Sequence, residues 1–306
     1  MKSRRDFLKA AGTLAASGLI FKPVNGVAEK VGKTSGLPVA KSVKNIGLQL
    51  YTVRNDIAKD GVEAVLEKVA KIGYKWVEGF GYEDRKILGK TPKDFKALLD
   101  KLGLTMPSCH SVTQVSTAGG KSAIVDQMKS TTEDVKESGA EFLVWAFLAE
   151  SDRKSIDDYK KHIETWNQFG QVCKDSGIQF AYHNHNFEFT DLEGQRPYDL
   201  ILRETDPNLV KFEMDLYWIV KAGFDPVEYF KKAPGRFPMW HVKDMEKGPD
   251  KFFTEVGNGT IDFARIFAAR STSGMKYFFV EQDESRKTPL ESIEISFKYL
   301  QQASFI

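Results

Sequence analysis

The feature that most constrains this chain is a repeated alternation of short apolar runs with amphipathic helical segments. Eight runs rich in β-branched and aromatic residues occupy 45–51, 74–80, 104–110, 140–147, 178–185, 210–218, 237–244 and 276–283. The segments between them have helical periodicity, as in 61–73, which ends at Gly73, and in 92–103, which starts at Pro92 and ends at Gly103. Strands that alternate with helices indicate a parallel sheet with right-handed crossovers.

Eight such units within residues 45–306 predict an α/β fold, a single (β/α)8 barrel. A doubly wound open sheet is the alternative, but it needs a nucleotide crevice, and no glycine-rich phosphate turn follows the first strand. The run VGNGTIDF at 256–263 comes too late for that role. We expect Gly257 and Gly259 to form a turn and Asp262 to cap the next helix.

The first residues have the pattern of an export signal. Residues 3–9 read SRRDFLK, and the apolar stretch AAGTLAASGLIF and small residues at Gly26 and Ala28 follow. The paired Arg4 and Arg5 resemble the twin-arginine signal. We therefore predict a twin-arginine signal peptide over 1–28, a polar linker over 29–44, a periplasmic location and no stable membrane anchor in the mature form.

Charge and cysteine content narrow the partners. Residues 1–28 carry a net charge of +4 in a chain of +2, so the remainder is near −2. A slightly acidic body without a basic run argues against nucleic acid as a partner. Cys109 and Cys173 lie far apart and outside any metal-binding spacing, which predicts free thiols rather than a disulfide. The sequence leaves the oligomeric state open, a homo-oligomer included.

Polar groups gather near the carboxyl ends of seven of the eight apolar runs, and the fourth run offers Trp145 instead. They are Gln49, Glu78, His110, His183, His185, Asp215, His241, Lys243, Asp244, Glu281 and Asp283. In a barrel these ends converge on the face where active sites lie. Burial of one such group without a partner costs a few kcal/mol, so packing alone does not explain the pattern.

Four of these groups form a candidate metal site: His183, Asp215, His241 and Glu281, one from each of the last four runs. Imidazole with carboxylate ligands suits a divalent ion, and a mixed oxygen and nitrogen set with open positions favours Mn²⁺ over Co²⁺, Fe²⁺, Zn²⁺ or Mg²⁺. His185 shares one strand face with His183 and is the alternative ligand. Each residue alone has an ordinary structural explanation, and their co-occurrence at four consecutive strand ends supports the metal site.

The remaining polar and aromatic groups are candidates for catalysis and substrate binding. Acid–base chemistry is expected from His110, Glu281, Glu188 and Lys243. Substrate contacts are expected from Gln49, Glu78, Trp145, His185 and Trp218, with Tyr51 and Phe147 as further apolar walls.

These motifs resemble the xylose isomerase-like barrels grouped as sugar phosphate isomerases and epimerases. The resemblance covers about residues 45–300, and exported members with a YHNH run form a recognisable branch. Its carriers are GLQLYTVR (47–54), the Glu78 strand, the SCH turn ending at His110, YHNHNFEF (182–189), MDLYW (214–218), WHVKD (240–244), VGNGTIDF (256–263) and FFVEQDE (278–284).

The resemblance implies one divalent ion held by Asp215, His241 and Glu281, with His183 in the strand-five position. In the related epimerases that position is a glutamate that also moves a proton. Because a histidine replaces it here, a two-glutamate proton relay does not carry over, and Glu188 or His110 would take the missing role. Relatives that cut DNA use a three-zinc cluster, for which this sequence lacks the ligands.

The expected divalent ion and the acid–base residues beside it predict chemistry at the carbon next to a carbonyl. Removal of the α proton gives an enediolate, which a divalent ion stabilises, and return of the proton elsewhere is isomerisation or epimerisation. We therefore predict a metal-dependent sugar isomerase or epimerase. Its substrate is expected to be an unphosphorylated keto-sugar, since Lys243 stands without a cationic cluster. A lyase or hydratase acting on 3-keto-sugars or keto-glycosides is the alternative, and a non-catalytic sugar-binding barrel is a further one.

Overall fold

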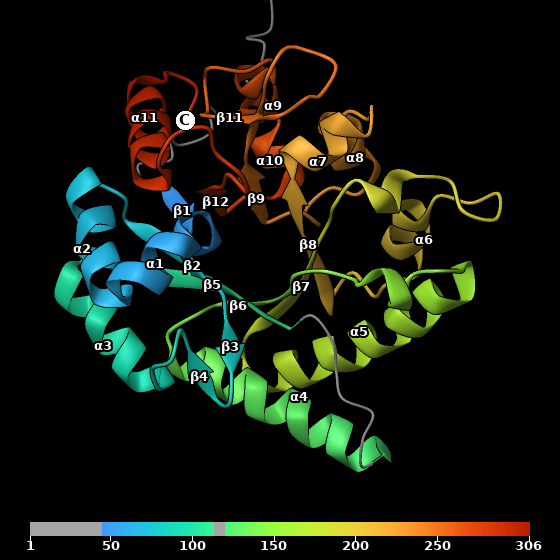
Figure 1. Ribbon diagram of the computed structural model, residues 1–306. Helices are drawn as coiled ribbons and strands as arrows, with labels where there is room; N and C mark the ends of the chain where they lie inside the picture. Colours follow the sequence, from blue (N-terminus) through green and yellow to red (C-terminus); the bar gives the residue numbers. More distant parts are fainter. Residues whose placement is uncertain (1–44, 113–119) are drawn as a thin grey trace, which may run out of the picture. The chain divides into compact units, whose positions relative to one another are not determined.

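The computed structural model describes residues 45–112 and 120–306, so the predicted signal peptide and linker lie outside the described residues. Eight parallel strands close into a barrel in the order β1-β12-β9-β8-β7-β6-β5-β2, with helices around it (Figure 1). The strands are β1 (Gly47–Gln49), β2 (Trp76–Gly79), β5 (Thr105–Val112), β6 (Phe142–Trp145), β7 (Gln179–His183), β8 (Val210–Asp215), β9 (Met239–Val242) and β12 (Tyr277–Val280). The predicted single (β/α)8 barrel is confirmed.

Helices follow the strands around the barrel. They are α1 (Arg54–Asp60), α2 (Val62–Ile72), α3 (Pro92–Leu102), α4 (Gly120–Glu137), α5 (Ile156–Ser176), α6 (Pro197–Glu204), α7 (Leu216–Lys221), α8 (Pro226–Lys232), α9 (Phe263–Ala268), α10 (Arg270–Ser273) and α11 (Pro289–Gln302). Two small hairpins, β3 (Tyr82–Glu83) with β4 (Lys86–Ile87) and β10 (Asp244–Met245) with β11 (Phe253–Thr254), and three 3-10 turns, η1 (Leu50–Val53), η2 (Glu150–Asp152) and η3 (Phe187–Phe189), complete the described elements.

Local sequence signals account for several helix ends. Pro92 occupies the first turn of α3, and α3 ends at Gly103, whose φ of 66° is left-handed. The Asp262 side chain accepts the Arg265 N–H and caps α9, as the run VGNGTIDF predicted. Gly257 has a φ of 96°, which agrees with the predicted turn.

Period-2 alternation divides each barrel strand between the interior and the helices. Phe142, Val144, Ala181, Met239 and Phe279 pack together as one buried cluster, and the larger buried cluster lies against the helices. The interior-facing positions turn polar toward the carboxyl ends of the strands. The polar groups that matter for chemistry are therefore confined to one end of the barrel.

Cys109 and Cys173 are both buried free thiols, as predicted. Within the described ranges, no helix is long and apolar enough to cross a membrane.

Candidate metal centre and active-site cavity

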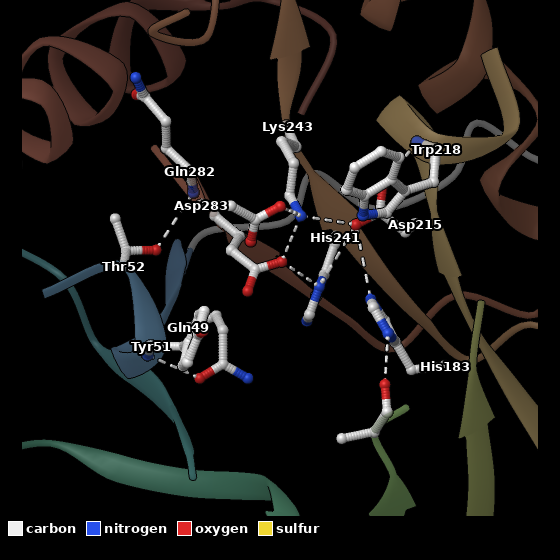
Figure 2. A network of polar contacts seen from close by, with 12 residues as sticks. Gln49, Tyr51, Thr52, His183, Asp215, Trp218, His241, Lys243, Gln282 and Asp283 are labelled. Atoms are coloured by element: carbon white, nitrogen blue, oxygen red, sulfur yellow. Dashed lines mark hydrogen bonds and ion pairs between the residues drawn. The ribbon is translucent and has the colours of Figure 1, made fainter. Parts of the chain in front are cut away.

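The four side chains of the candidate metal site meet at the carboxyl ends of neighbouring strands. Figure 2 labels three of them, His183, Asp215 and His241. His183 ends β7, Asp215 ends β8, His241 lies in β9, and Glu281 follows β12 directly. His183 Nε2 lies 3.4 Å from Asp215 Oδ2, and His241 Nδ1 lies 2.7 Å from Glu281 Oε2. One ligand atom from each residue falls within 4.8 Å of the other three, and all four residues are buried.

The same four atoms face one another rather than separate hydrogen-bond partners. His183 Nε2, Asp215 Oδ2, His241 Nδ1 and Glu281 Oε2 are all buried, and apart from close contacts within this group and with Lys243 Nζ none of them has a hydrogen bond among the described residues. Buried polar atoms that leave their hydrogen-bonding capacity open in this way are uncommon. Four of them converging on one point, two nitrogens and two carboxylate oxygens, fit the donor set of a divalent metal ion.

Hydrogen bonds to the second ring nitrogen orient both histidines. His183 Nδ1 lies 3.1 Å from the carbonyl oxygen of Ala146, and His241 Nε2 lies 2.6 Å from Glu78 Oε2. Each of these partners accepts a hydrogen bond from the ring N–H, so the other nitrogen of each ring faces the ligand set. The structure therefore favours His183 over His185 as the β7 member, because His185 is outside the converging group.

Backbone contacts fix the third member. Asp215 Oδ1 accepts the N–H of Trp218 and caps α7, which leaves Oδ2 for the ligand set. The side-chain amide of the fully buried Asn184 accepts from the Asp215 N–H at 3.1 Å and donates to the Asp215 carbonyl at 3.4 Å. Asn184 thus ties the end of β7 to the end of β8 and holds Asp215 in place.

A buried lysine balances the carboxylates around the centre. Lys243 Nζ lies 2.9 Å from Asp215 Oδ2, 2.7 Å from Glu281 Oε2 and 2.9 Å from Asp283 Oδ2 (Figure 2). Burial opposes its charge, but these carboxylates raise the pKa of Lys243 well above its usual range. Burial likewise opposes ionisation of Glu281, and Lys243 with His241 holds the pKa of Glu281 below its usual range. The carboxylates of the centre are therefore in the ionised form that binds metal.

The two histidines of the centre differ in protonation. Burial lowers the pKa of His183, which favours its neutral, metal-binding form. Burial also opposes a charge on His241, but Glu213, Glu281 and Glu78 raise the pKa of His241 well above its usual range. Metal binding at His241 Nδ1 therefore releases a proton from this ring.

A second buried cluster lies beneath the centre. Glu78 accepts hydrogen bonds from Gln49 Nε2 at 2.7 Å and Ser108 Oγ at 2.5 Å, in addition to the one from His241. His110 Nε2 lies 2.7 Å from Glu213 Oε2. Sequence analysis missed Glu213, although it stands two residues before Asp215 and hence on the same strand face. This cluster supports the ligands from below.

Two of the four candidate ligands, His183 and Glu281, line an open cavity of about 590 Å³, whereas Asp215 and His241 lie behind this lining. Its lining contains six residues that the sequence had placed in the site: His110, His183, His185, Trp218, Lys243 and Glu281. Tyr51 and Phe147, expected as apolar walls, line it as well. The cavity also takes in residues that were not singled out, among them Arg54, Phe80, Phe253, Asp283 and Glu284.

Two residues expected to contact substrate are instead fully buried below this lining. Gln49 and Glu78 are bonded to each other, and neither reaches the cavity. Both lie near the carboxyl ends of their strands, as expected, but beneath the residues that line the cavity. The structure gives Glu78 a different role, as the acceptor that orients His241.

Trp145 and Glu188 also lie away from the cavity. The Trp145 side chain points to the opposite face of β6 from Val144, toward the helices. It packs against Trp166 of α5 and donates its indole N–H to the Phe147 carbonyl. Glu188 is fully buried, accepts hydrogen bonds from Tyr182 Oη and the His185 N–H, and does not line the cavity. Burial raises the pKa of Glu188 to about 7. Neither residue is placed to touch a substrate.

Comparison with known proteins assigns the family. A family model described as xylose isomerase-like TIM barrel matches residues 66–303. The chain belongs to the xylose isomerase-like TIM barrel family. The resemblance seen in the sequence is therefore confirmed.

Three relatives show how this member compares with others. An inosose dehydratase of Clostridium botulinum is 28% identical over 298 residues, which cover 82% of this chain and 93% of the relative. A sugar phosphate isomerase/epimerase structure from Parabacteroides distasonis is 31% identical with a TM-score of 0.76, covering 86% of this chain and 100% of the other. The structure of an IolI protein with a zinc atom shares the fold, with a TM-score of 0.67 at 16% identity over 84% of this chain and 96% of the other. The chain is an enzyme of this family.

Proposed function

We propose that this enzyme is a divalent-metal-dependent lyase or hydratase that eliminates a β-oxygen substituent from an unphosphorylated keto-sugar. The sequence alone favoured an isomerase or epimerase, with the lyase or hydratase as the alternative, and the present proposal exchanges the two. The observation that carries the proposal is the division of the cavity lining. The carboxylates that reach it, Glu281, Asp283 and Glu284, all follow β12. The imidazoles of His110 and His183 come from β5 and β7, and that of His185 comes from the segment directly after β7.

This division bears on the choice between reactions. Epimerisation by two carboxylates needs one on each side of the substrate, and among the described residues the β5 and β7 wall carries imidazoles instead. Elimination uses a base for the α proton and an acid that protonates the departing oxygen. A carboxylate wall opposite an imidazole wall supplies that pair. The similarity to inosose dehydratases supports the same reaction class.

Each residue then has a defined task. A divalent ion held by His183, Asp215, His241 and Glu281 would supply the positive charge that stabilises an enolate. Glu281 lines the cavity, and its second carboxylate oxygen, Oε1, is placed to remove the α proton. His110 is placed to protonate the departing oxygen, because Glu213 holds its Nε2 and the ring lines the cavity. The C–H and C–O bonds break, a C=C bond forms, and water or an alcohol leaves.

The charges of the lining support an unphosphorylated substrate. Its cations are Arg54 and Lys243, and Lys243 is already paired with three carboxylates. A phosphate would face Asp283 and Glu284 without an unpaired lysine or arginine cluster to bind it. For the metal we propose Mn²⁺, since the donor set combines two nitrogens with two carboxylate oxygens.

Isomerisation or epimerisation is the second candidate, favoured by the 31% identity to the sugar phosphate isomerase/epimerase structure. Both reactions begin with the same α-proton removal, so one experiment separates them. The Mn²⁺-loaded enzyme is incubated with a panel of keto-sugars in D₂O and followed by NMR. Loss of the β-oxygen substituent with a new alkene signal supports elimination. Deuterium incorporation with the carbon skeleton and all oxygens retained overturns it in favour of the second candidate.

We propose a periplasmic location by twin-arginine export, on the basis of Arg4 and Arg5. Replacement of both arginines by lysine should leave a folded and active protein in the cytoplasm. Cell fractionation that finds unchanged export would overturn this proposal.

A further inference from the structure

The mouth of the cavity carries exposed aromatic rings. Among the described residues, the exposed large apolar side chains are Tyr51, Val125, Phe147 and Tyr299. Two of these, Tyr51 (41% exposed) and Phe147 (38% exposed), line the same cavity. Exposed aromatic side chains that gather at one concave site mark a binding surface, whereas scattered ones need no explanation.

Neighbouring side chains hold both rings in place. Tyr51 meets Phe80 edge to face at 5.5 Å, and the Arg54 guanidinium lies 4.1 Å from the centre of the Tyr51 ring. On the other wall, Phe147 packs edge to face on Phe187 at 5.8 Å. Rings fixed in this way lose little conformational freedom when a ligand stacks on them, which favours binding.

The two rings lie outside the metal centre. From the ligand His183, the ring contacts lead to His185 at 4.9 Å and from there to Phe147 at 5.1 Å. On the opposite side, Arg54 donates a hydrogen bond to the Asp283 carbonyl, and the Asp283 carboxylate contacts Lys243. One residue therefore separates Phe147 from the metal centre, and two residues separate Tyr51 from Lys243.

The cavity has room for more than one ring. Its volume of about 590 Å³ lies within the range of about 300–1,000 Å³ found for drug-sized ligands, which are larger than a single sugar ring. A keto-sugar at the metal centre would leave the outer part, between Tyr51 and Phe147, to another group. The faces of sugars and aryl groups both stack on aromatic side chains.

We propose that this aromatic rim, formed by Tyr51, Phe80 and Phe147, is an outer subsite for a second, uncharged ring joined through oxygen to the keto-sugar. This inference rests on the proposed elimination and names its leaving group. The C–H bond α to the carbonyl and the C–O bond to the second ring break, a C=C bond forms, and the second ring leaves as an alcohol that has gained a proton. Arg54 donates two N–H groups to backbone carbonyls, and its remaining donors are available to hydroxyls of that ring.

Binding of unreactive probes tests the subsite independently of turnover. Affinities of the Mn²⁺-loaded enzyme for methyl β-glucoside, phenyl β-glucoside and cellobiose are measured by calorimetry, for the wild type and for Tyr51→Ala and Phe147→Ala. We expect the two-ring probes to bind more tightly than the methyl glucoside. Each substitution should weaken two-ring binding about tenfold relative to one-ring binding, the scale of one aromatic contact.

The chain offers a matched control in Tyr299, which is 40% exposed and lies outside the cavity lining. Tyr299→Ala should leave all three affinities unchanged, and Tyr51→Leu and Phe147→Leu provide variants that keep apolar volume if an alanine variant fails to fold. Equal affinity for one-ring and two-ring probes, or insensitivity to both rim substitutions, overturns the subsite even if keto-sugars are turned over. Rim-dependent binding of two-ring probes upholds the subsite even if no elimination is found.

Discussion

Replacement of Glu78 by glutamine separates the role expected from the sequence from the one seen in the structure. The sequence places Glu78 in contact with substrate, whereas the structure buries it and makes it the acceptor for His241 Nε2 at 2.6 Å. A glutamine can keep the shape and one carbonyl acceptor. It removes the negative charge that makes the His241 ring a stronger donor to metal through Nδ1.

The magnitude follows from this single hydrogen bond. Loss of a partner that orients a metal-binding histidine costs about 10–100-fold in metal affinity, or about 1.4–2.7 kcal/mol. The Gln49 and Ser108 contacts can persist, since the new carbonyl oxygen can replace Glu78 Oε2 as acceptor for Gln49 Nε2 and the Ser108 hydroxyl can turn to accept from the new amide. We therefore expect Glu78→Gln to fold and to bind Mn²⁺ about 10–100-fold more weakly, with little change in KM at saturating metal.

The measurement is a competition titration of the metal-free protein with Mn²⁺ against a chromophoric chelator, accompanied by kcat and KM at saturating metal. Glu188→Gln is the matched control, because Glu188 is a fully buried carboxylate that contacts Tyr182 and the backbone rather than a ligand. It should bind metal like the wild type. Unchanged metal affinity in Glu78→Gln together with a raised KM would refute the structural reasoning and restore the substrate contact.

Three further predictions follow from the site. Glu281→Gln and His241→Ala should each abolish α-proton exchange and lower metal occupancy measured by elemental analysis, since each removes one of four ligands; full occupancy in either would exclude that residue. His110→Ala should retain metal but lose about 10²–10⁴ in turnover, and loss of the metal would show that the ligand set is wrong. Burial raises the folded-state pKa of Glu188 from about 4.5 to about 7, so its contribution to stability is largest below about pH 4.5 and declines as pH rises to about 7. Relative to the wild type, Glu188→Gln should therefore gain up to about 3 kcal/mol in unfolding free energy between pH 4.5 and pH 8, and a constant difference in urea unfolding across that range would contradict this assignment.

The sequence predicted those parts of the fold that depend on near neighbours. The helix signals at Pro92 and Gly103 act within one or two turns, and the structure begins and ends α3 as they require. The eight apolar runs predicted a barrel because parallel strands joined by helices have few ways to bury both faces. The run boundaries were less accurate. The first run was expected over 45–51, but β1 covers only Gly47–Gln49 and a 3-10 turn follows it.

The sequence also led us to expect the four candidate ligands close together, and their ligand atoms converge within 4.8 Å, because the carboxyl ends of parallel strands share one face of a barrel. Orientation was harder to predict. Trp145 lies outside the cavity because pairing with the neighbouring strands sets the phase of β6, and the residues after Glu141 in this run are all apolar and do not reveal that phase. Glu188 lies outside it because this residue is in the 3-10 turn η3, beyond the end of β7.

What the sequence by itself determined is the class of fold and the end of the barrel that carries chemistry. Only the tertiary structure decided how deep each polar side chain lies and in which direction it points. It decided which polar groups line the cavity, which ones bond to the candidate ligands from beneath, and which nitrogen of each histidine faces the ligand set. These properties depend on contacts between residues far apart in the chain, such as Glu78 with His241, which are separated by 163 positions. Local periodicity repeats over two to four residues and carries no information about such a pair.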